Sequence, residues 1–86
     1  MVRLSSSEFL YLKNTSFLRE ELLQLLNTAE AQSNGVHILR VSAAIAEEFR
    51  DAFTERLAKA GFDRTYELTR EGELLEALID KFGLQP

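Results

Sequence analysis

The one histidine of this sequence, His37, is the side chain whose ordinary pKa lies closest to neutral pH. A catalytic histidine needs a nucleophile and an orienting carboxylate beside it, and no spacing along the chain identifies either. The sequence has no cysteine and no second histidine, whereas zinc sites use three or four ligands. We therefore expect a structural histidine in a strand, with no metal and no cofactor. A small enzyme or enzyme subunit that uses His37 is kept as an alternative.

Acidic side chains crowd one side of a predicted helix: Glu47, Glu48, Asp51 and Glu55. Like charges at helical-neighbour spacing repel by a few tenths of a kcal/mol each, roughly, unless cations such as Lys59 offset them. One interpretation is a solvated helix face. The other is a docking patch of Glu48, Asp51 and Glu55 for a protein with a basic surface, which would speed association more than it would raise affinity.

Glycines and aromatic residues give no cofactor motif. The four glycines, Gly35, Gly61, Gly72 and Gly83, are too widely spaced for a phosphate-binding loop, so we interpret them as turns or helix ends, except Gly72 in the first turn of a helix. Most aromatic residues lie in apolar stripes and are expected in the core. Tyr11 and Tyr66 are the two that could present an amphipathic ring to a partner.

Three amphipathic segments predict helices over residues 16–31, 43–60 and 70–82. Each has a candidate N-cap, namely Thr15 or Ser16, Ser42, and Thr69. Glycine follows the second and third segments, as is typical of helix C-termini.

Three short segments have strand character. Residues 36–41 are apolar on both faces and predict an interior strand, while residues 65–69 predict an edge strand. Residues 8–13 are a third candidate, although Ser5 and Glu8 also form a capping box that would start a helix. The resulting order is β-α-β-α-β-α. We expect an α/β or α+β fold with a three-stranded sheet, three amphipathic helices on one or both faces, and helical crossovers that can join parallel strands.

One local resemblance concerns residues 57–62 (LAKAGF) and 66–75 (YELTREGELL). These segments resemble the wing and the following helix of winged-helix transcription regulators, and they cover about a fifth of the chain. The resemblance implies a small DNA-binding regulator that uses residues 59–75. Upstream the sequence departs from that pattern, because residues 50–60 run on without the break that a helix-turn-helix requires.

Length and charge bound the function class. The 86 residues predict one domain over 1–86, which buries roughly 60–65% of its unfolded surface. Ten basic and fourteen acidic residues give a net charge of −4, which offers little attraction to nucleic acid. The absence of cysteine and of a long apolar run favours the cytoplasm and disfavours a membrane anchor. We expect a small acidic, non-catalytic protein-binding or regulatory module, of the antitoxin or immunity type among bacterial accessory proteins, with a homodimer also open.

Overall fold

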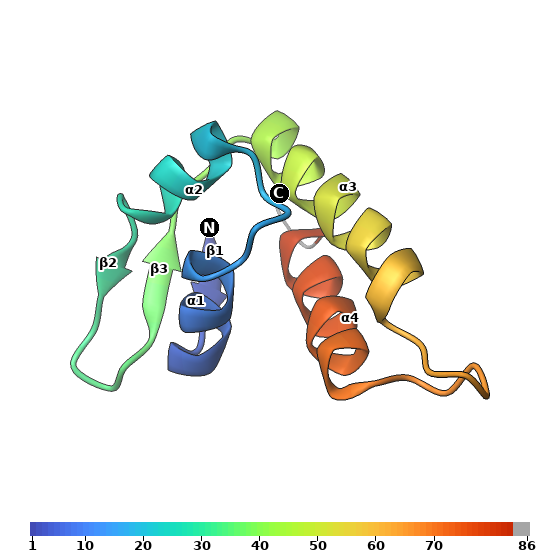
Figure 1. Cartoon of the computed structure of the whole chain (residues 1–86). Helices are drawn as coiled ribbons and strands as arrows, with labels where there is room; N and C mark the ends of the chain where they lie inside the picture. Colours follow the sequence, from blue (N-terminus) through green and yellow to red (C-terminus); the bar gives the residue numbers. More distant parts are fainter. Residues whose placement is uncertain (84–86) are drawn as a thin grey trace.

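The computed structural model describes residues 1–83, which form three strands and four helices in the order β-α-α-β-β-α-α. These elements are β1 (Val2–Leu4), α1 (Ser6–Lys13), α2 (Glu20–Leu26), β2 (Glu30–Ala31), β3 (His37–Leu39), α3 (Ala43–Ala60) and α4 (Arg70–Gly83). Figure 1 shows α3 and α4 as a helical hairpin beside the half of the molecule that contains the sheet, α1 and α2. The fold is α+β.

The sheet has the strand order β1-β3-β2, and both pairings are antiparallel. Val2 pairs with Leu39, and Glu30 pairs with Ile38. The predicted three-stranded sheet is thus confirmed, and the interior strand predicted over residues 36–41 is present as the shorter central strand β3, over residues 37–39. The expected parallel crossovers are not present, because β2 and β3 form a hairpin whose turn includes Gly35 at φ +84°.

Residues 8–13 form a helix and not the strand proposed from the sequence. Ser5 is the N-cap of α1: its hydroxyl accepts the Glu8 amide at 3.2 Å, and its own amide donates to the Glu8 carboxylate at 2.8 Å. This reciprocal capping box satisfies two amides that otherwise lack partners and decides the competition in favour of the helix. The third strand of the sheet is instead β1, at residues 2–4, which was not predicted from the sequence.

The first predicted helix, over residues 16–31, is shorter in the structure. It begins at Glu20 because Arg19 is the extended N-cap of α2, and it ends at Leu26. The residues on either side have other roles: Leu18 is buried in the core from a non-helical segment, and Glu30–Ala31 is strand β2.

The other two helices agree with the sequence. Helix α3 spans the predicted residues 43–60, with Ser42 as its N-cap and Gly61 as its C-cap, and α4 extends one residue beyond the predicted end. The predicted edge strand over residues 65–69 is wrong. These residues belong to the loop that joins α3 to α4, and only a single bridge, between Phe62 and Leu68, forms there.

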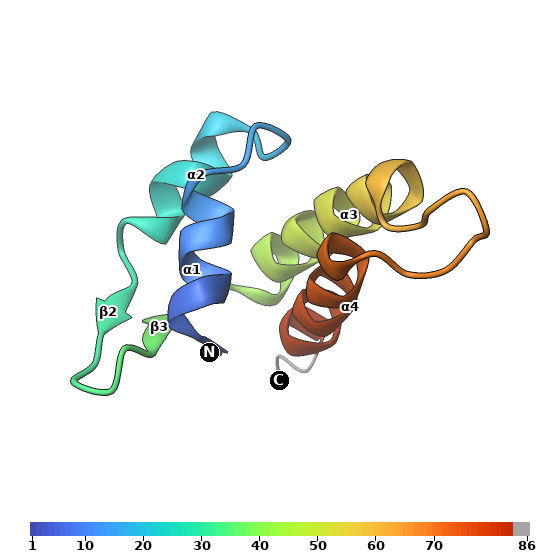
Figure 2. The same cartoon turned by 60° about the horizontal axis from the view of Figure 1, so that its bottom comes forward.

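Buried side chains from both halves form one core, which joins β1, β3 and all four helices. Its centre is aromatic: Phe49, Phe53 and Phe82 are fully buried, and their ring centroids are 4.8 to 6.0 Å apart. The loop between α3 and α4 projects away from this core in both views (Figures 1 and 2). No helix within residues 1–83 is both long and apolar enough to span a bilayer.

Candidate functional site

The loop that joins α3 to α4, residues 61–69, is held in shape by its own hydrogen bonds. The Asp63 carboxylate accepts from the Thr65 amide at 2.8 Å, from the Thr65 hydroxyl at 2.7 Å and from the Glu67 amide at 3.1 Å. The Asp63 amide donates to the Glu67 carbonyl at 2.9 Å. The Thr65 and Glu67 hydrogen bonds hold the pKa of Asp63 below its usual range, so the carboxylate that organises the turn stays ionised.

Three apolar side chains are exposed on this loop. Tyr66 is 87% exposed, Phe62 is 45% exposed and Leu68 is 36% exposed. Phe62 and Leu68 face each other across the bridge, where paired side chains lie on the same face. We call Phe62, Tyr66 and Leu68 the tip residues.

The backbone of Tyr66 has a left-handed conformation, with φ at +64°. It is the one described residue other than glycine with positive φ. That conformation costs a non-glycine residue roughly 1 kcal/mol, and glycine or asparagine adopts it more readily. Since the tyrosine ring is almost entirely in solvent, burial within this chain does not offset the cost.

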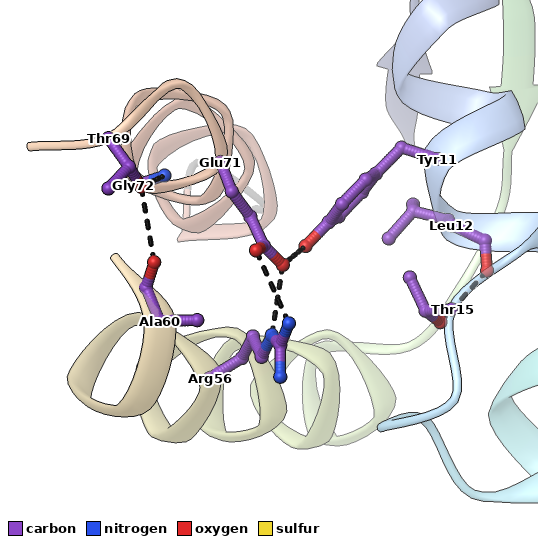
Figure 3. Close-up of polar contacts among 8 residues, drawn as sticks. All are labelled: Tyr11, Leu12, Thr15, Arg56, Ala60, Thr69, Glu71 and Gly72. Carbon is purple, nitrogen blue, oxygen red and sulfur yellow. Dashed lines mark hydrogen bonds and ion pairs between the residues drawn. The ribbon is translucent and has the colours of Figure 1, made fainter. Parts of the chain in front are cut away.

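The base of the loop is anchored to both helices. Thr69 donates its hydroxyl to the Ala60 carbonyl at 3.1 Å and accepts the Gly72 amide at 3.0 Å, so it caps α4, as predicted, while it holds the end of α3 (Figure 3). A Cβ atom on Gly72 would lie 2.1 Å from the Gly61 carbonyl oxygen. Glycine at position 72 is therefore required by the close approach of α4 to the end of α3.

A second polar cluster joins α1, α3 and α4. Glu71 accepts the Tyr11 hydroxyl at 2.5 Å and the Arg56 guanidinium at 2.9 and 3.3 Å (Figure 3). Arg56 also lies 5.8 Å from the centre of the Phe17 ring. The cluster borders an open cavity of about 470 Å³, whose other lining residues include Leu10, Asn14 and Ser16.

The protonation of this cluster is fixed at neutral pH. The Arg56 and Tyr11 hydrogen bonds hold the pKa of Glu71 below its usual range. Burial, together with the hydrogen bond to Glu71, raises the pKa of Tyr11 above its ordinary value. Tyr11 thus remains a neutral donor and Glu71 an ionised acceptor, which suits a structural connection between three helices and does not suit proton transfer.

The predicted docking residues Glu48, Asp51 and Glu55 lie on α3 at the spacing of successive helical turns, with Glu48 half-buried and the other two exposed. Two of them are engaged in ion pairs: Glu48 with Arg19, and Glu55 with Lys59 at 3.1 Å. Asp51 is exposed and has no ion pair among the described residues.

His37 stacks against Phe9, with the two ring centroids 3.8 Å apart and the planes nearly parallel. Its Nδ1 atom is buried without a hydrogen-bond partner in residues 1–83. No carboxylate within that range forms an ion pair with the ring, so the contact that the structure gives His37 is an aromatic stack.

Sequence analysis identified Tyr66 as a candidate contact residue but missed Phe62 and Leu68. The available signal was their position outside the apolar stripes of α3 and α4. Across residues 1–83, no three histidine or acidic side chains come together as a metal site. The region of the winged-helix resemblance forms the end of α3, the loop and the start of α4, and α3 is unbroken from residue 43 to residue 60. Comparisons with protein-family models, with curated proteins and with solved structures found no match for this chain.

Proposed function

We propose that this chain is a non-catalytic protein-binding module that contacts its partner through the tip residues. The observation that carries the proposal is Tyr66, a large aromatic side chain held in solvent by a strained, hydrogen-bonded loop. Strained residues persist where the surrounding structure enforces them, and they cluster at functional sites. Tyrosine is also among the residues that contribute most to protein interfaces.

The fixed conformation of the loop, which the Asp63 hydrogen bonds maintain, favours binding as well. A contact surface that is already fixed loses less conformational entropy on association than a flexible one. Phe62 and Leu68 place two further apolar side chains beside each other on the same loop, which gives a partner more than a single ring to cover.

The acidic residues of α3 take a secondary role in this proposal. Glu48, Asp51 and Glu55 would steer a partner that has a basic surface, and Asp51 has the charge least offset by a neighbouring cation. Long-range attraction of this kind raises the association rate and weakens as salt is added.

The test uses affinity capture on the immobilised chain from a lysate of its host, followed by purification of each captured protein and measurement of its binding. Tyr66→Asn removes the ring while asparagine retains the left-handed conformation. We expect it to weaken binding of the partner roughly tenfold or more, as truncation of a central interface residue does. Neutralising Glu48, Asp51 and Glu55 together should slow association and leave dissociation nearly unchanged.

Leu10→Gln is the matched control, because Leu10 is also an exposed apolar side chain, 59% exposed, but lies on α1 and not on the loop. The control should retain binding. If every purified partner binds the Tyr66→Asn and wild-type proteins equally, the tip residues are not the binding surface and the proposal fails.

A further inference from the structure

A shallow groove lies on the surface between α3 and α4, separate from the tip residues. Its lining consists of Leu57 from α3 and Glu76, Ile79 and Asp80 from α4, and its volume is about 360 Å³. The two apolar residues are half-buried, and the two acids are exposed. We call these four residues the acidic groove.

Within residues 1–83, no ion pair offsets the charge of the groove. Glu76 and Asp80 are four residues apart, so they are neighbours on one face of α4 and repel each other. Neither forms an ion pair with any described cation, in contrast to Glu8, Glu48, Glu55 and Glu71. Arg50 of α3 lies beside Gly83, three residues after Asp80 at the same end of α4, but within residues 1–83 it forms no ion pair with Glu76 or Asp80.

We infer that the acidic groove binds a basic amphipathic helix of the partner, an inference that rests on the proposed function. A lysine or arginine side chain can lay its aliphatic part on Leu57 and Ile79 while its charged end reaches an acid. Two such residues four apart on a helix have the same spacing as Glu76 and Asp80. An amphipathic helix in a groove is a common mode of peptide recognition, and its leucine side chains would cover the apolar floor.

The charge of the groove also disfavours other occupants. A nucleic acid strand would place phosphates against Glu76 and Asp80, and a second copy of this chain has the same net negative charge. A cationic helix is the occupant whose charge and apolar surface both match the groove.

The experiment uses a synthetic helical peptide with lysines at i and i+4 flanked by leucines, titrated into the ¹⁵N-labelled protein. The expected result is a set of amide shifts centred on residues 57, 76, 79 and 80, with an affinity that decreases as NaCl is raised. The double variant Glu76→Gln with Asp80→Asn should weaken the peptide roughly tenfold, because two exposed ion pairs are lost.

Two controls make the result specific. Glu20→Gln with Glu30→Gln removes the same charge from α2 and β2 and should change the affinity less than about twofold. A peptide with glutamate in place of lysine should not bind. Equal weakening by both double variants, shifts spread over all acidic surfaces, or no binding of the lysine peptide at millimolar concentration would each overturn the inference.

The Tyr66→Asn variant separates this inference from the proposed function. It should bind the lysine peptide like the wild type, so a failure of the tip residues to bind a partner would leave the result for the groove intact. If Tyr66→Asn weakens the peptide as much as the groove variant does, the two surfaces are one site and the separate groove is contradicted.

Discussion

The two ends of the α3–α4 hairpin carry aromatic side chains in opposite surroundings. At one end Phe53 and Phe82 are fully buried, with ring centroids 5.1 Å apart. At the other end Phe62 and Tyr66 are exposed on an ordered loop. Burial of apolar surface is the main stabilising contribution in a small domain, so the first end explains how the hairpin is held in place. The exposed aromatic side chains of the second end contribute little burial within residues 1–83, and this difference is the reason for proposing that end as a binding surface.

The largest predicted effect is on stability, and it compares a buried ring at one end of the hairpin with an exposed ring at the other. We expect Phe53→Ala to lower the free energy of unfolding by about 3–5 kcal/mol, because it removes a buried ring and leaves a cavity. Phe62→Ala should lower it by less than about 1 kcal/mol, since much of that ring is already in solvent. Urea unfolding followed by circular dichroism measures both. Equal losses would mean that the tip is part of the core.

A smaller loss should follow from changing the point where the two helices meet below the tip. Gly72→Ala should lower the free energy of unfolding by about 2–3 kcal/mol, because the added methyl group meets the Gly61 carbonyl and the backbone must shift. Gly83→Ala makes the same change in the same helix, where the new atom would lie at an ordinary 3.5 Å from Arg50. It should be neutral or stabilising by up to about 1 kcal/mol. Similar losses for both variants would show that the close approach is not what limits position 72.

The smallest effect concerns Glu8, which lies far from the tip and is buried at 6% exposure. Its burial disfavours the charge, but hydrogen bonds from Lys81 at 2.6 Å and from the Ser5 amide outweigh this, and the pKa of Glu8 is lowered from its ordinary value of 4.5. A carboxylate with a lowered folded-state pKa stabilises the fold fully above pH 4.5 and loses that contribution as the pH falls through the folded-state pKa.

We therefore expect Glu8→Gln to cost about 1–2 kcal/mol at pH 7, and we expect the difference from wild type to shrink as the pH approaches 3. Urea midpoints over that pH range test this. Glu20→Gln, at an exposed position of α2, is the control for loss of a surface carboxylate and should change the free energy of unfolding at pH 7 by less than about 0.5 kcal/mol. A pH-independent difference for Glu8→Gln would assign the loss to packing instead of charge.

The elements that could be predicted from the sequence are those whose signals are local. Helix α3 has a cap at Ser42, an apolar stripe and a terminal glycine within one stretch of chain, so its limits were predicted to the residue. The sheet is different, since β1 pairs with β3 more than thirty residues away and has only Val2 and Leu4 as its apolar pattern. Three residues of alternation are too few to predict a strand.

The candidate site was predictable only in part. Tyr66 was identified as a residue that could meet a partner, but its left-handed backbone depends on the Asp63 hydrogen bonds, which require the folded loop. The acidic groove needs two helices side by side, and the apolar stripes predict the buried face of each helix but not which helices pack together. Tyr11 was grouped with Tyr66, yet it donates to Glu71 across sixty residues of chain. Contacts over that separation are set by the tertiary structure and not by local pattern.

The anchor formed by Thr69 and Gly72 has a consequence for how the protein can diversify. Because the crossing of α3 and α4 is fixed beneath the loop, we expect substitutions at exposed loop positions such as Arg64 and Tyr66 to leave the helices that carry the core in place. The hairpin thus combines a fixed helical framework with a loop whose exposed side chains are free to vary. If the proposed binding surface is correct, we expect variation at those exposed positions to change which partner is bound and to leave the stability of the fold nearly unchanged.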